Sequence, residues 1–262
     1  MFISYLHAIP EFWLKTLAAV GIFLLAMMAG YPRLKKNPNN ATTYSGHNLH
    51  AISSGIFLGT SLLHLLPESQ MAFVAYDQSS HYPWGFLLAG LIFLFLLCLE
   101  HITIELEHDH QGAKKSIGLT MSMMFVILIM HALFEGMALG FAKEWVAVTL
   151  VLAILAHKWT ESFALSNMLD RSQWTTTLKK ICFLIFVLTT PLGMMLAMLL
   201  KSPQTNPILQ ATCNAMAAGT FLYIGTLHGL KRSIMVDRCC NIKEFFWLLF
   251  GFVVMAFLAI WL

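Results

Sequence analysis

Long apolar stretches separated by short polar connections dominate the pattern of this 262-residue chain. A bilayer core about 30 Å thick needs roughly 20 consecutive apolar residues in a helix. Eight stretches reach about that length, at residues 10–31, 47–69, 83–105, 117–142, 145–169, 179–200, 207–230 and 243–262. The pattern predicts an all-α integral membrane protein, with eight transmembrane helices in a single transmembrane domain that covers residues 1–262.

The composition agrees with a membrane protein. Hydrophobic residues make up 58% of the chain and charged residues only 11%, whereas soluble domains carry about 25% charged residues. The connections between the apolar stretches are too short to form a separate domain. The chemistry of the protein is therefore expected inside the membrane.

Most of the 16 lysines and arginines lie in alternate connections, at residues 31–46, 106–116, 170–180 and 231–243. Basic residues concentrate in cytoplasmic loops, so these connections are expected in the cytoplasm. Lys15, Lys143 and Lys201 are expected near the opposite face. An even number of spans then places both termini on the extracytoplasmic side.

Two histidine–glutamate pairs stand inside neighbouring apolar stretches. His131 precedes Glu135 by four residues, and His157 precedes Glu161 by four, so each pair lies on one face of a helix. The two helices form a hairpin that turns near Lys143. Both histidines are 12 to 14 residues from this turn, which places them at the same depth of roughly 18–20 Å. The two pairs are expected to face each other.

A carboxylate at the centre of a bilayer costs on the order of 2.5–3.5 kcal/mol, so a buried glutamate needs a partner. Imidazole and carboxylate groups together bind zinc and neighbouring first-row metals. The alternative is a structural network in which each glutamate pairs with Lys158. Two pairs at matched depth favour a site for one divalent cation.

Four segments also resemble the ZIP (Zrt/Irt-like) metal-ion transporters, across the whole length of the chain. The segments at 131–140 (HALFEGMALG) and 156–165 (AHKWTESFAL) resemble the signatures of the family's fourth and fifth spans. The segments at 55–67 and 219–223 are similar to its second and seventh spans. The resemblance implies transport of Zn²⁺, Cd²⁺, Fe²⁺ or Mn²⁺ into the cytoplasm, and the donor set also suits Co²⁺. It further implies a homodimer, and an elevator-type movement of spans one, four, five and six against the others.

Carried over residue by residue, the resemblance places the metal ligands at His131, Glu135, His157 and Glu161. Family members that bind two ions have an asparagine and an acidic residue at the positions of Ala132 and Lys158. We therefore expect a single-metal site, in which the Lys158 ammonium replaces the second ion. This pattern resembles the branch of the family with His-Lys in the fifth span.

Other histidines lie near the expected ends of the pathway. His64 is expected toward the outer face, where it suits an entrance for the ion, while an exit role is considered for His47, His50, His108 and His110. The bilayer and divalent ions are the expected partners. Neither an organic cofactor nor a nucleic acid is expected. Short loops favour a multi-pass protein of the plasma membrane, in particular a bacterial inner membrane.

An intramembrane zinc hydrolase is the main alternative function. It would need three protein ligands to zinc, an open coordination position and a general base, which the two pairs could supply. The chain has no His-Glu-x-x-His motif, however, and this pattern marks many zinc hydrolases. The sequence therefore favours a transporter over an enzyme.

Overall fold

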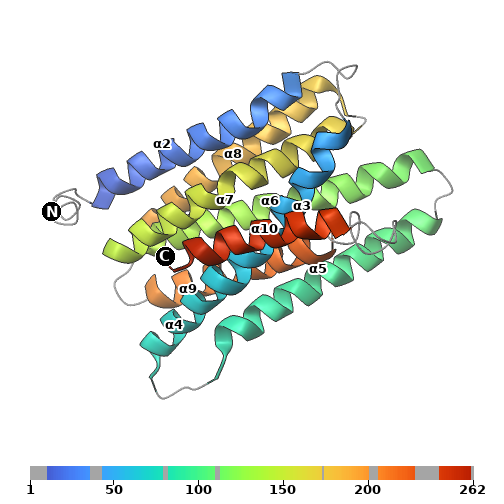
Figure 1. Cartoon of the computed structure of the whole chain (residues 1–262). Helices are drawn as coiled ribbons and strands as arrows, with labels where there is room; N and C mark the ends of the chain where they lie inside the picture. The colour runs from blue at the N-terminus through green and yellow to red at the C-terminus, as the bar shows by residue number, and fades with distance from the viewer. Residues whose placement is uncertain are drawn as a thin grey trace.

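The computed structural model describes residues 11–35, 43–78, 82–109, 113–172, 174–200, 206–227 and 242–260, and these residues form a helical bundle (Figure 1). The main helices are α2 (Glu11–Gly30), α3 (Thr43–Thr60), α4 (Leu66–Tyr76), α5 (Trp84–Asp109), α6 (Ala113–Phe141), α7 (Glu144–Arg171), α8 (Thr176–Leu199), α9 (Asn206–Tyr223) and α10 (Ile242–Leu258). A short 3₁₀ helix, η1 (Tyr31–Lys35), follows α2. Because α3 runs on into α4, these elements correspond to the eight expected helices.

The second expected helix is longer than the apolar stretch at 47–69. A π-helical turn, η3 (Ser61–Leu65), joins α3 to α4 without a break, and Pro67 lies in the first turn of α4. Inside a continuous helix a proline lacks the amide that would bond to the preceding turn, and here it directly follows the π-helical turn, where the Leu66 amide bonds to the Ser61 carbonyl five residues back. The continuous helix therefore extends to Tyr76, two turns beyond the expected end.

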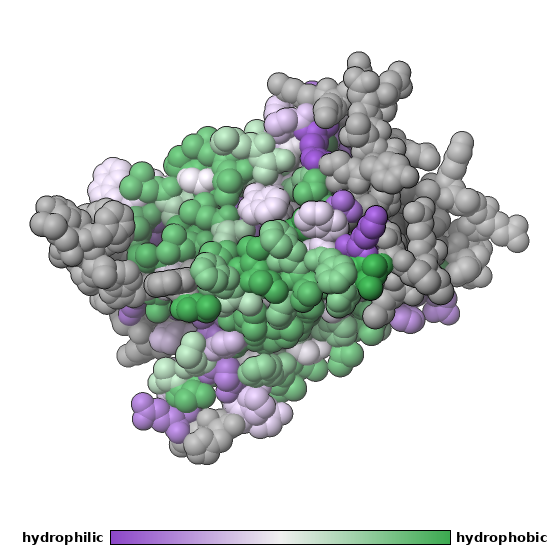
Figure 2. All heavy atoms as spheres, in the orientation of Figure 1, coloured by the Kyte–Doolittle hydropathy of each residue, from purple (hydrophilic) through white to green (hydrophobic). Residues whose placement is uncertain are grey.

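Six of these helical segments are long and apolar enough to cross a membrane. They are α2, the continuous α3–α4, α5, α6, α7 and α8. The helices α9 and α10 are shorter, with 18 and 17 residues. Hydrophobic side chains cover much of the middle of the visible face in Figure 2, as expected for a surface in contact with lipid tails.

Glycines bring the backbones of two helix pairs into direct contact. A Cβ added to Gly136 of α6 would meet the Thr190 carbonyl of α8, and one added to Gly193 would meet the Leu133 carbonyl of α6. The pair of α3 and α10 is built the same way, through Gly55 and Gly251. Small residues permit close helix approach in membranes, where packing replaces the hydrophobic effect. The first of these contacts holds α6 against α8, and the second holds α3 against α10.

Lys15, which was expected near one face of the membrane, is buried inside the bundle. Its side chain is only 1% exposed on the inner side of α2, and its Nζ donates hydrogen bonds to the carbonyls of Gly140 and Ala142 at 2.6 and 2.7 Å. The last carbonyls of a helix carry a partial negative charge and have no partner within it. Lys15 therefore caps the end of α6 and ties α2 to it.

Candidate metal centre

The four residues predicted as metal ligands come together inside the bundle. α6 and α7 are separated by only two residues and run antiparallel, so that His131 and Glu135 face His157 and Glu161. One ligand atom from each residue lies within 4.8 Å of the others. All four side chains are buried, and none is more than 3% exposed. The expected juxtaposition of the two pairs is thus present.

The inner oxygens of both glutamates face the imidazoles. His157 Nε2 lies 2.5 Å from Glu135 Oε1 and 3.3 Å from Glu161 Oε1. His131 Nε2 lies 3.7 Å from Glu161 Oε1 and 4.0 Å from Glu135 Oε1. Ligands of one tetrahedral zinc ion are roughly 3.4 Å apart, given metal–ligand distances near 2.1 Å. Small side-chain adjustments would bring these four atoms onto one cation.

Lys158 binds the other oxygen of each glutamate. Its Nζ donates to Glu135 Oε2 at 2.9 Å and to Glu161 Oε2 at 2.7 Å, and its side chain is fully buried. One ammonium group therefore compensates the two carboxylates and orients them, with their Oε1 atoms turned toward the imidazoles. Ala132, the other position expected to differ from two-metal sites, is also buried and offers no ligand atom.

A hydrogen-bond network on α9 fixes the ring of His131. The Thr220 hydroxyl donates to the Ala217 carbonyl at 2.7 Å, so its oxygen is left to accept from His131 Nδ1 at 2.7 Å. The same carbonyl also lies 3.1 Å from Nδ1. Both neighbours act as acceptors, which places the imidazole proton on Nδ1. The lone pair of Nε2 then points into the site, the arrangement that a metal-binding histidine requires.

Phe221 closes the α9 side of the site. Its ring stacks on His131 with centroids 3.6 Å apart and meets His157 edge-on at 5.2 Å. Behind it, Phe57 of α3 stacks on the same ring at 4.8 Å. The two aromatic rings form an apolar wall beside both imidazoles, which limits water access and strengthens electrostatic interactions within the site.

Removing the Thr220 hydroxyl should weaken metal binding. Thr220→Val keeps the side-chain shape but removes the closer of the two acceptors for His131 Nδ1 and leaves the Ala217 carbonyl at 3.1 Å. Loss of such an orienting partner costs about 10- to 100-fold in metal affinity. Isothermal titration of the purified protein with Zn²⁺ measures the effect, and Thr220→Ser should restore it. Thr226→Val is the matched control, because the Thr226 hydroxyl donates to the Leu222 carbonyl four residues earlier in the chain and not to a residue of the site. Equal affinities for the Thr220→Val and Thr226→Val proteins would contradict this role.

His64 and His50, considered for the entrance and the exit, are not among the four residues whose ligand atoms converge. His64 is buried in η3 and lies 3.9 Å from Glu68 Oε2. His50 Nε2 lies 2.5 Å from the Asn167 side chain, between α3 and α7. The side chains of His47 and His108 lie outside the described part of the structure, as does His110.

Thr220 and Phe221 are the neighbours that sequence reasoning did not assign to the site. They belong to the segment Gly219–Tyr223, which resembles the seventh span of the family, but the resemblance assigns them no role. A threonine and a phenylalanine in an apolar helix carry no chemical signal of their own. Only the packing of α9 against α6 reveals their function as neighbours of His131.

The bundle and its buried donor set define a helical membrane protein with a centre suited to a divalent cation. The family model described as ZIP zinc transporter matches residues 12–122 and 103–259. The chain belongs to this family. Its membership places it among transporters rather than enzymes, so the hydrolase alternative is not favoured.

Curated relatives agree with this assignment over most of the chain. Zinc transporter ZIP2 of Mus musculus is 26% identical over 266 residues, which cover 81% of this chain and 84% of that protein. Zinc transporter ZIP1 of Homo sapiens is 27% identical over 221 residues, covering 70% of this chain and 68% of that protein. Protein zntD of Dictyostelium discoideum is 33% identical over 169 residues, but these cover only 25% of its length.

Proposed function

We propose that this protein carries divalent transition-metal ions, zinc foremost, through a site formed by His131, Glu135, His157 and Glu161. The observation that carries the proposal is the convergence of one ligand atom from each residue within 4.8 Å, inside a bundle of apolar helices. Membership in a family of zinc transporters supports it independently.

The proposed site takes one metal ion at a time. Lys158 bridges the two glutamates where a second ion would otherwise compensate them. With both glutamates ionised and Lys158 protonated, the centre carries a net charge of −1, and a bound divalent ion changes it to +1. A small net charge in both states lowers the electrostatic cost of moving the site through a low-dielectric region.

The ion is proposed to enter from outside and leave into the cytoplasm. In this arrangement α9 and α10 also cross the membrane, which gives eight spans. The start of α2 and the end of α10 lie toward the same end of the bundle in Figure 1, which supports a common side for both termini. The basic connections identified in the sequence support a cytoplasmic location for the opposite end.

An elevator-type movement would open the metal site first to one side of the membrane and then to the other. The moving unit would contain α2, α6, α7 and α8, which are joined by the glycine contacts of α6 with α8 and by Lys15. The scaffold would contain α3, α4, α5, α9 and α10, where Ser61 and Ser69 bond to carbonyls of α9. The contacts of His131 with Thr220 and Phe221 cross between the two units.

The donor set accepts several divalent ions as cargo. Two imidazoles and two carboxylates also accept Cd²⁺, Fe²⁺, Mn²⁺ and Co²⁺, and the affinity order among them does not select one. The family resemblance supports a homodimer, and the short connections between the helices favour the plasma membrane, in particular a bacterial inner membrane.

Ion flux tests the proposed function directly. Proteoliposomes loaded with a fluorescent zinc chelator should show a protein-dependent signal when Zn²⁺ is added outside, compared with liposomes that lack protein. A hydrolase would instead release product from a labelled lipid or peptide without ion flux. No zinc flux from monodisperse, correctly inserted protein would overturn the transport proposal.

A further inference from the structure

A second buried polar cluster lies beside the proposed transport site. It consists of His64 in η3, Glu68 in α4 and Asn214 in α9. His64 Nε2 is 3.9 Å from Glu68 Oε2, and Asn214 Nδ2 donates to the same oxygen at 3.2 Å. Within the described residues, His64 Nε2 and Asn214 Oδ1 are both buried without a hydrogen-bond partner. A buried polar atom without a partner destabilises the folded protein, so two in one cluster need an explanation.

The three side chains together offer ligands for a cation. An imidazole nitrogen, a carboxylate and an amide oxygen are all suitable donors for first-row divalent metals. Ligands of a tetrahedral ion are roughly 3.4 Å apart, close to the 3.9 Å between His64 and Glu68. Rotation of the Asn214 amide would exchange its nitrogen and oxygen, so that the oxygen faces a cation bound at Glu68.

Hydrogen bonds to α9 place this cluster relative to the transport site. Ser61 Oγ donates to the Ala218 carbonyl, whereas His131 Nδ1 lies against the neighbouring carbonyl of Ala217. Ser61 is therefore level with His131. At 1.5 Å per residue, His64 lies about 5 Å and Glu68 about 10 Å further along the helix. The cluster therefore lies between the transport site and the end of α4.

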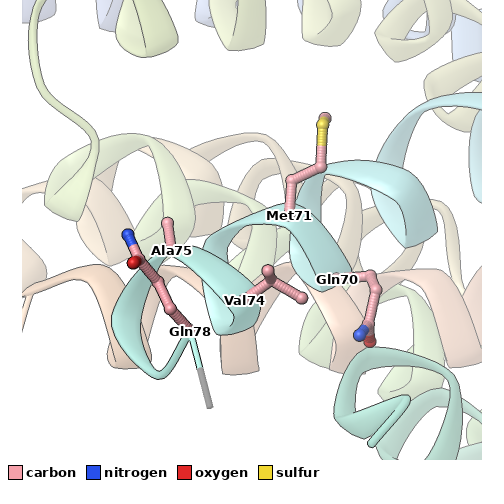
Figure 3. A pocket seen from close by; sticks show the side chains of 5 residues that line it. All are labelled: Gln70, Met71, Val74, Ala75 and Gln78. Carbon is pink, nitrogen blue, oxygen red and sulfur yellow. The ribbon is translucent and has the colours of Figure 1, made fainter. Parts of the chain in front are cut away.

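The cluster has an approach from the surface. The Glu68 side chain is 14% exposed, while His64 behind it is only 3% exposed. Further along α4 and just beyond it, Gln70, Met71, Val74, Ala75 and Gln78 line a separate pocket of about 420 Å³ (Figure 3), which none of the three cluster residues lines. The π-helical turn that carries His64 is a rare conformation, often found at functional sites.

We propose that His64, Glu68 and Asn214 form a second cation site, which receives a divalent transition-metal ion from outside and passes it to the transport site. The inference rests on the proposed transport function and its orientation. With a single carboxylate and a single imidazole, this outer site binds its ion less tightly than the four-ligand centre does. Weaker binding lets the ion move inward instead of remaining trapped.

Cobalt binding to a protein without a functional transport site tests the proposal. Full-length His157→Ala protein in nanodiscs is titrated with Co²⁺, and the visible absorption of the bound ion is recorded. One Co²⁺ equivalent should remain, with an affinity about tenfold or more below that of the wild-type centre. Adding Glu68→Gln or His64→Gln to His157→Ala should remove this equivalent. Adding Glu105→Gln is the matched control, because Glu105 is exposed on α5.

The proposal is overturned if His157→Ala protein retains no Co²⁺ equivalent, or if the Glu105→Gln and Glu68→Gln additions have the same effect. In the otherwise wild-type protein, Glu68→Gln should raise the KM for zinc uptake about tenfold, with the transport site still titrating at its original affinity. An unchanged KM would contradict the transfer role. Absence of flux in the wild type would reject transport instead, while leaving the cobalt result interpretable.

Discussion

Zinc uptake should fall about 100-fold or more when Glu161 is replaced by glutamine. The substitution keeps the size of the side chain but removes the charge beside the imidazoles, where Glu161 Oε1 lies 3.3 Å from His157 Nε2 and 3.7 Å from His131 Nε2. Loss of a partner that merely orients a metal ligand already costs about 10- to 100-fold in affinity, so loss of a ligand should reach at least the upper end. The measurement is the initial rate of zinc entry into chelator-loaded proteoliposomes.

Glu105→Gln provides the control for this experiment, since it makes the same chemical change at an exposed position on α5. Its uptake rate should match that of the wild type at equal protein content. Zinc titration of both proteins in detergent distinguishes a binding defect from slow movement. A wild-type rate of zinc uptake by the Glu161→Gln protein would show that Glu161 is not a ligand of the transport site.

Replacing Lys158 by methionine should make the stability of the protein depend on zinc. Methionine leaves Glu135 and Glu161 buried together without the ammonium that bridges them, and loss of one partner from a buried ion pair costs about 3–5 kcal/mol. A bound divalent ion would neutralise both carboxylates. At a concentration 1,000 times its Kd, a ligand raises the free energy of unfolding by about 4 kcal/mol. Thermal unfolding in detergent, with a chelator and with excess zinc, measures the difference.

Lys143→Met is the matched control, because Lys143 is exposed between α6 and α7. Its unfolding temperature should respond to zinc as the wild type does. In the same series, Lys158→Asp should bind one metal equivalent more than the wild type, since an acidic ligand replaces the ammonium. A Lys158→Met protein with wild-type stability in chelator would show that the lysine does not compensate the glutamates.

The positions of the helices could be predicted from the sequence because the bilayer sets a length that apolar stretches must reach. The ends were less predictable. The helix expected at 47–69 continues to Tyr76, because the three polar residues at 68–70 interrupt the apolar stretch without ending the helix. The π-helical turn at Ser61–Leu65 was not predicted, since no residue type specifies it.

The four candidate ligands could be predicted because their spacing and common depth follow from helix geometry alone. Contacts with other helices could not, since they depend on which faces meet. Lys15 illustrates this limit. Near the end of an apolar stretch it resembles a residue that reaches for water, yet the carbonyls at the end of α6 bind it inside the bundle. The same holds for Thr220 and Phe221, whose roles arise only where α9 contacts His131.

The attachment of α2 through Lys15 has a consequence for the role of the lipid. One side of α2 packs on α7 and α8, while Leu17, Val20, Leu24 and Met28 are exposed on its outer side. If the hairpin slides as proposed, α2 slides with it and carries these side chains to a new level in the hydrocarbon. Each level has its own mismatch cost, which is a fraction of a kcal/mol per ångström. Bilayer thickness thereby becomes one of the determinants of how fast the carrier turns over.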